Sequence, residues 1–277
     1  MLAFAYGFKI AIWLAGLGLF ARILLGRLRL TPPALAAWPV AIEDFVIAIL
    51  LVAAGGFLMP YAATVLGPAA RDGNGSMVVQ GFAFQSGLLG GVFLSFLYIR
   101  RQLRQTPPPL EIPVTDMAQP AATPTRHPLL AGTVTFLVAV PLIDGLGFVW
   151  KMLLEQLGYS TGEQEMIDLF RNVDHPLLLV LIVTLAAVVA PITEELIFRA
   201  GLFRYLRTRI PWPLALVIPA LLFALPHGNL AAFLPLCVLG VIFSLAYERT
   251  GRIAVPMIAH ALFNLHTLLL VMSGVTT

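Results

Sequence analysis

Eight long apolar runs dominate this sequence and leave few folds open to it. Most are close to the roughly 20 residues that an α-helix needs to cross a bilayer, and none shows the alternation of a half-buried strand. The runs fall at residues 3–25, 40–66, 77–99, 129–152, 176–203, 212–227, 229–247 and 253–273. Because only helices and closed barrels satisfy their backbone inside a membrane, the sequence predicts an all-α, polytopic transmembrane helical bundle of about eight spans.

Charged residues make up only 11% of the chain and hydrophobic residues 59%. A soluble domain carries about 25% charged and 45–50% apolar residues. The composition therefore excludes a soluble globular protein, a disordered chain and a nucleic-acid-binding domain. The lipid bilayer is the expected partner, and nucleic acid is not.

The basic residues indicate how the chain is oriented. Thirteen of the 17 lysines and arginines lie at or after the ends of the first, third, fifth and seventh runs. By the positive-inside rule these loops are cytoplasmic and both termini lie outside. The N-terminus lacks a basic region before its apolar stretch and a cleavage site before Arg22, so we read it as a retained first span. The preference for arginine over lysine hints at a bacterial protein, which places it in the inner (cytoplasmic) membrane.

A proline-rich stretch suggests how the chain is divided. Residues 105–128 are poor in large apolar residues and are expected to form an extended cytoplasmic linker. The linker separates a three-helix N-terminal segment, 1–104, from a five-helix core, 129–277. Within the third run, Gly87 and Gly91 have the GxxxG spacing that allows two helices to pack closely.

Ionisable side chains inside apolar runs are costly and therefore indicate function. Glu194 and Glu195 are adjacent in the fifth run, and Arg199 follows four residues after Glu195. In a regular α-helix Glu195 and Arg199 share a face and can pair, whereas Glu194 is rotated by about 100°. Glu195 would then stay ionised beside Arg199, and Glu194 would be the desolvated acid and the better candidate for a general base. A purely structural ion pair beside one pore-facing acid remains the alternative on this segment alone.

Two further runs carry polar side chains at comparable depth. His227 ends the sixth run four residues after Phe223, and His260 and Asn264 share one face of the eighth. Counted from the predicted cytoplasmic loops, Glu194, His227, His260 and Asn264 lie about 12–24 Å deep at 1.5 Å per residue. They could therefore meet in one cavity. Structural burial or interhelical hydrogen bonding is the alternative for each of them taken singly.

The three segments together resemble the motifs of the CPBP family of intramembrane glutamic endopeptidases, which includes CaaX proteases and bacteriocin-processing enzymes and is also called Abi. The family pattern is EExxxR, FxxxH and HxxxN on successive membrane helices. It is matched by Glu194-Glu195 with Arg199, by Phe223 with His227, and by His260 with Asn264. Ala200 departs from the glycine that usually follows the arginine. The resemblance covers roughly residues 130–272.

The resemblance implies hydrolysis of a peptide bond in a membrane-associated protein or peptide precursor. Glu194 would activate water with His227 helping to position it, His260 and Asn264 would form the oxyanion hole, and Glu195 with Arg199 would orient the site. The residue chemistry agrees with these roles, because a tetrahedral oxyanion needs donors such as a neutral His and an Asn amide.

Other functions stay open at this point. Two His and two Glu could bind zinc, but no HExxH is present, so we expect no cofactor and disfavour zinc. The protein could instead be a non-catalytic immunity or scaffold protein that binds a peptide partner in the same cavity. A proton-coupled transporter is less favoured, because no internal repeat is apparent.

Overall fold

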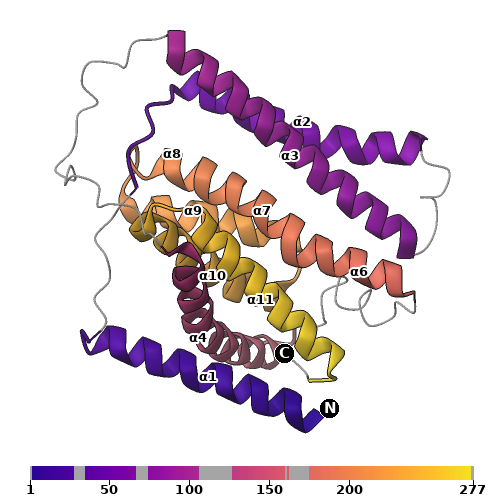
Figure 1. Cartoon of the computed structure of the whole chain (residues 1–277), viewed down its shortest axis with the longest axis vertical. Helices are drawn as coiled ribbons and strands as arrows, with labels where there is room; N and C mark the ends of the chain where they lie inside the picture. The colour runs from indigo at the N-terminus through magenta and orange to yellow at the C-terminus, as the bar shows by residue number, and fades with distance from the viewer. Residues whose placement is uncertain are drawn as a thin grey trace. The chain divides into compact units, whose positions relative to one another are not determined.

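The computed structural model describes residues 2–27, 35–66, 74–105, 127–159, 161 and 175–275. These residues form helices and no strands (Figure 1). Most of the expected linker, residues 106–126, lies outside the described residues, as do residues 162–174 after the fourth run.

Seven of the described helices are long and apolar enough to cross a membrane, which confirms the polytopic helical bundle. The eighth expected span, Trp212–His227, is apolar but shorter. Many large hydrophobic side chains of the spanning helices are exposed, as lipid-facing residues require. The seven helices are Leu2–Leu24, Ile42–Leu66, Gly75–Gln105, Pro128–Gln156, Pro176–Leu206, Leu230–Thr250 and Ala254–Met272.

The chain forms two compact units that are not consecutive stretches of sequence. Unit 1 comprises residues 1–36, 121–172 and 198–277, and unit 2 comprises residues 37–120 and 173–197. The sequence-based division at residues 104 and 129 stays a prediction.

In unit 2, α2 (Ile42–Leu66) and α3 (Asn74–Gln105) lie side by side and antiparallel (Figure 1). Glycines make this approach close: a side chain on Gly87 would collide with the carbonyl oxygen of Gly55, and one on Gly91 would meet Val52 Cα at 2.5 Å. The close packing predicted from the GxxxG spacing is therefore confirmed, with α2 as the partner.

The fifth apolar run is not one regular α-helix. It consists of α6 (Pro176–Thr184), the π-helical η2 (Leu185–Val189), α7 (Ala190–Glu195), the π-helical η3 (Leu196–Phe203) and α8 (Arg204–Leu206). Pro191 explains η2, because it has no N–H to donate to the carbonyl of Ala187 and its ring crowds that turn. The regular α-helical spacing assumed for Glu195 and Arg199 is thus wrong in detail, since Arg199 lies within η3.

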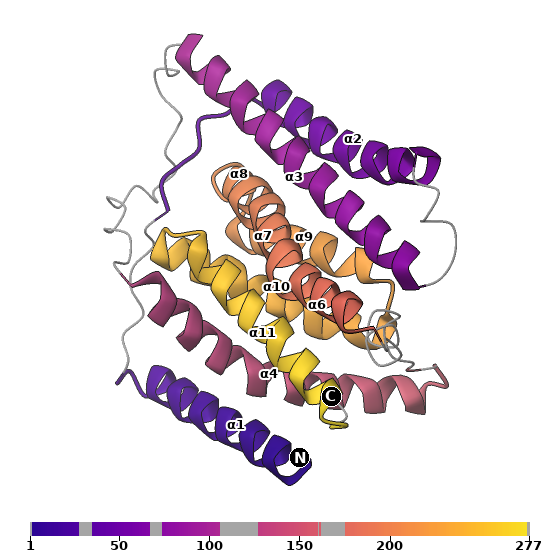
Figure 2. The ribbon, with the colours of Figure 1, turned by 45° about the vertical axis from the view of Figure 1, so that its right-hand side comes forward.

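Unit 1 is built on α4 (Pro128–Gln156), with α1 (Leu2–Leu24) and α11 (Ala254–Met272) as neighbours (Figure 2). Its core combines Ile12 of α1, Phe136 and Val140 of α4, and Phe243 and Ala259 of the last two helices. The first helix therefore packs against helices that follow it by more than 100 residues.

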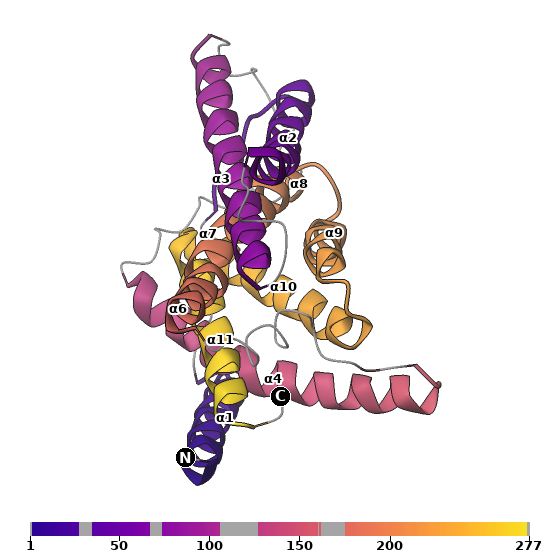
Figure 3. The same cartoon turned by 90° about the vertical axis from the view of Figure 1, so that its right-hand side faces the viewer.

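The helices α9 (Trp212–Ala224) and α10 (Leu230–Thr250) form an antiparallel pair in unit 1, and the turn between them is visible in Figure 3. Near the start of α9 and the end of α10, a largely buried ion pair joins Arg207 to Glu248 at 2.9 Å. Trp212 Nε1 donates to Glu248 at 3.0 Å, and Arg207 donates to the carbonyl of Leu35 at 2.7 Å. These bonds satisfy a carboxylate that would otherwise be costly to bury.

Candidate active site

Phe223 is the centre of the polar cluster in unit 1. Its ring is 1% exposed and lies in α9. The guanidinium carbon of Arg199 lies 4.4 Å from the centroid of this ring. The ring centroids of His227 and His260 lie 5.4 Å and 5.7 Å from it, at interplanar angles of 61° and 80°. One phenylalanine thus brings together three of the six residues singled out from the sequence.

Arg199 is buried, with 1% of its surface exposed. Its Nη2 donates to the carbonyl of Gly240 at 3.2 Å, and its guanidinium carbon lies 5.3 Å from the ring centroid of Phe243. The two aromatic faces attract the cation through their quadrupoles, and this attraction strengthens when the pair is desolvated. Gly240 allows Arg199 and the backbone of Ala220 to lie close to α10, since a Cβ at this position would lie 3.4 Å from Nη2 and 3.0 Å from Ala220 Cα.

His227 is held by the way α9 ends. The chain passes from α9 into the 3-10 turn η4 (Leu225–His227), and then through Gly228 at φ +61° into α10. Asn229 begins α10 by accepting a hydrogen bond from the backbone N–H of Ala232 at 2.9 Å. A left-handed glycine followed at once by a capping asparagine makes the turn short and fixes where His227 lies.

The hydrogen bond of His227 defines which ring nitrogen carries the proton. Nδ1 lies 3.1 Å from the carbonyl oxygen of Phe223. Because a carbonyl can only accept, Nδ1 is the donor, and in the neutral ring Nε2 keeps its lone pair. A water molecule at Nε2 could therefore be held by His227 acting as an acceptor.

His260 lies in α11 and is 3% exposed. Its ring packs between Phe223 and Phe243, with the Phe243 centroid 5.2 Å away. Asn264 follows one helical turn later and is half-buried. Both side chains are placed by a helix, which is the arrangement needed to hold hydrogen-bond donors in a fixed direction.

The two glutamates belong to unit 2, which ends at Ile197 in this part of the chain. Both end α7, immediately before the π-helical segment that carries Arg199. Glu195 is fully buried, whereas Glu194 is half-buried. The sequence predicts that Glu194 is the desolvated acid of the two, but the structure buries Glu195 more deeply, so this prediction is wrong. Short π-helical segments are rare in proteins, and those that occur are often found at functional sites.

The sequence reasoning did not single out Gly240 and Phe243. They lie at i and i+3 in α10, and Ser244, one residue on, donates to the carbonyl of Gly240 at 3.0 Å. A glycine and a serine four residues apart in an apolar run are a signal of a helix-packing face, which could have identified α10 as the wall of this cluster.

Within the described parts of the chain, no group of three or more His, Cys, Asp or Glu side chains has the arrangement of a metal site. This geometric observation leaves the expectation of a metal-free protein as a prediction.

Comparison with known proteins gives the class of protein. Residues 176–266 match the family described as type II CAAX prenyl endopeptidase Rce1-like, and this segment contains all six predicted site residues. The resemblance drawn from the three motifs is thereby confirmed: the chain is a polytopic membrane protein whose residues 176–266 match the Rce1-like family.

Individual relatives are bacterial. The chain is 32% identical over 105 residues to the putative membrane peptidase YdiL of Bacillus subtilis, covering 38% of this chain and 41% of YdiL. It is 39% identical over 85 residues to the membrane-embedded CAAX protease MroQ of Staphylococcus aureus, covering 28% of this chain and 34% of MroQ. It is 30% identical over 131 residues to an uncharacterised 24.3 kDa protein of Escherichia coli, covering 44% of this chain and 60% of that protein. In each case the chain spans less than two thirds of the relative. No solved structure matches the chain significantly.

Proposed function

We propose that this protein is an intramembrane endopeptidase that cleaves a peptide bond in a membrane-associated protein or peptide precursor. The observation that carries the proposal is the gathering of Arg199, His227 and His260 around Phe223 within unit 1. The match of residues 176–266 to the Rce1-like family and the seven membrane-spanning helices support it.

In the proposed reaction Glu194 accepts a proton from water, and the resulting hydroxide attacks the carbonyl carbon of the scissile bond. His227 accepts a hydrogen bond from that water at Nε2. His260 and Asn264 donate to the oxyanion of the tetrahedral intermediate. Glu194 returns its proton to the amine as the C–N bond breaks. Glu195 and Arg199 orient the site and do not contact the reacting atoms.

The names of the Rce1-like family and of MroQ suggest a substrate with a CAAX C-terminus. For this chain the substrate is part of the proposal, and the cell's inner membrane is the proposed location. The purified full-length protein in proteoliposomes should therefore be tested on two internally quenched peptides that end in the same CAAX sequence, one farnesylated and one not. A precursor without a CAAX end would be found by comparing the membrane proteomes of cells that express active and inactive protein.

The decisive variant is Glu194→Gln, which keeps the shape and hydrogen bonding of the side chain but removes the base. We expect the cleavage rate to fall by at least about 10²-fold, the lower end of acid–base catalysis, with unchanged expression and unfolding temperature. A scaffold or immunity protein would keep its function in this variant. Proton-coupled transport by the wild type without any peptide cleavage would favour a transporter instead.

Glu195→Gln is the matched control on the same turn of helix. In the proposed orienting role Glu195 balances the charge of the buried Arg199, so a neutral glutamine would leave that cation uncompensated, and stability should fall together with activity. If Glu194→Gln cleaves normally while Glu195→Gln is stable but inactive, the base is Glu195. Elemental analysis of active protein tests the metal-free mechanism, and near-stoichiometric zinc would overturn it.

A further inference from the structure

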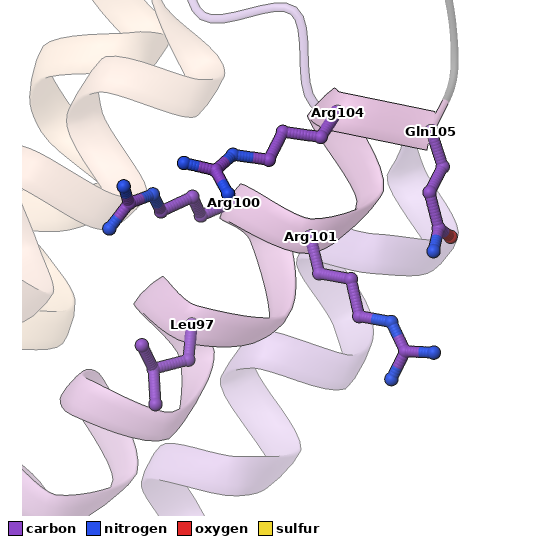
Figure 4. Close-up of a pocket in the computed structure, with 5 residues that line it drawn as sticks. All are labelled: Leu97, Arg100, Arg101, Arg104 and Gln105. Atoms are coloured by element: carbon purple, nitrogen blue, oxygen red, sulfur yellow. The ribbon is translucent and has the colours of Figure 1, made fainter.

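Three arginines crowd the C-terminal end of α3. Arg100, Arg101 and Arg104 line a hollow of about 370 Å³ together with Leu97 and Gln105 (Figure 4). Arg100 and Arg104 are one helical turn apart, and Figure 4 shows both side chains directed to the same side, with Arg101 directed to another. All three arginines are exposed. The end of this helix is therefore a concave, strongly basic surface within unit 2.

The charge of this cluster is not neutralised by ion pairs with the described residues. The nearest acidic side chains along the paired helix are Glu43 and Asp44, in the first turn of α2. Asp44 accepts a hydrogen bond from the hydroxyl of Tyr98 at 2.8 Å. No ion pair joins Arg100, Arg101 or Arg104 to a carboxylate in the described part of the chain.

The same part of α3 is apolar where it enters the predicted membrane. Phe93, Phe96 and Leu97 are 59%, 56% and 44% exposed. Phe93 precedes Leu97 by one turn, and Leu97 precedes Arg100 by three residues, so the two apolar side chains share a helix face with Arg100 and Arg104. This order of basic residues above apolar ones matches a phospholipid, which has a charged headgroup above acyl chains.

We propose that this end of α3 is a binding site for an anionic phospholipid, with the headgroup phosphate held by Arg100 and Arg104 and an acyl chain along Phe93 and Leu97. The planar guanidinium fork binds phosphate oxygens in pairs, and basic clusters next to a membrane helix attract anionic lipids. The positive-inside rule assigns this helix end to the cytoplasmic leaflet. The site does not depend on the proposed protease activity.

The test uses the full-length protein in neutral detergent and measures the binding of phosphatidylglycerol by native mass spectrometry and by the rise in unfolding temperature. Phosphatidylcholine with the same acyl chains and inorganic phosphate are the comparison ligands. The double variant Arg100→Gln/Arg104→Gln should bind phosphatidylglycerol about 5-fold more weakly for each arginine removed. The matched control, Arg22→Gln/Arg27→Gln, removes two exposed arginines at the end of α1 and should bind like the wild type.

A second double variant, Arg100→Lys/Arg104→Lys, keeps the charge but removes the planar fork. We expect weaker phosphatidylglycerol binding in this variant too, because lysine binds phosphate as a point charge. If the lysine variant binds phosphatidylglycerol as tightly as the wild type, or if the α1 control loses as much affinity as Arg100→Gln/Arg104→Gln, the lipid is attracted by general positive charge. Either result would overturn the proposed site. Equal stabilisation by phosphatidylcholine would overturn the requirement for an anionic lipid, and equal stabilisation by inorganic phosphate would identify a free-anion site instead.

Discussion

Trp13 in α1 donates a hydrogen bond from Nε1 to Oδ2 of Asp144 in α4 at a distance of 2.8 Å. Lys9 Nζ lies 3.9 Å from the same oxygen. Asp144 is 12 residues before the end of α4 at Gln156, about 18 Å along the helix. An acidic side chain so far inside a spanning helix needs partners, and α1 supplies both of them.

The first prediction concerns this pairing. In a double-mutant cycle of Trp13→Phe and Asp144→Ala, the interaction term in the free energy of unfolding should be about 1.5–3 kcal/mol, as for a hydrogen bond to a charged acceptor. The measurement is unfolding in mixed micelles. Phe4→Leu changes an exposed residue of α1 and should have little effect. A coupling of zero would mean that α1 is held by its apolar contacts alone.

The second prediction compares two glycines of α3. A Cβ on Gly87 would collide with the carbonyl oxygen of Gly55 and lie 2.9 Å from Met59 Cβ, whereas a Cβ on Gly90 would meet nothing within 4 Å. Gly87→Ala should therefore destabilise the protein by about 1–3 kcal/mol. Gly90→Ala should be neutral or stabilising by up to about 1 kcal/mol, since alanine favours the helix. Equal unfolding temperatures for both variants would contradict the close packing of α2 and α3.

The third prediction tests Phe223 as the organiser of the candidate site. Phe223→Leu removes the ring that contacts Arg199, His227 and His260, so their side chains lose a common support. We expect a loss of stability of about 1–3 kcal/mol and a fall in peptide cleavage of roughly 10–10²-fold from misplacement of the polar groups. Phe57→Leu is the control, because Phe57 is 80% exposed in α2. Normal cleavage by Phe223→Leu would show that Phe223 does not organise the candidate site.

The fourth prediction concerns orientation in the membrane. With Cys237, the chain's single cysteine, replaced by alanine, single cysteines are placed at Gln105, the last residue of α3, and at Tyr159, three residues after the end of α4. The distribution of basic residues predicts that only the cysteine at 159 reacts with an impermeant thiol reagent added from outside. Labelling of the cysteine at 105 from outside, with no labelling at 159, would show that the orientation in the membrane is the reverse of the predicted one.

Much of the architecture was predictable from the sequence because the bilayer restricts the chain so strongly. The apolar runs predicted the helices, and the GxxxG spacing predicted a close helix contact at Gly87 and Gly91. The spacing of Phe223 and His227 likewise predicted that the two side chains share a face, and their rings are in contact. Each of these features depends on residues within about one helical turn of each other.

Other features required the tertiary structure. The sequence does not say that α1 pairs with α4, that Phe243 and Gly240 of α10 enclose Arg199, or that π-helical turns flank the two glutamates. The physical reason is that lipid-facing and helix-facing sides of these helices are both apolar, so periodicity carries little information about which helix meets which. The sequence by itself determined which polar groups lie inside the membrane-spanning helices, and the packing of the helices decided which of them Phe223 brings together.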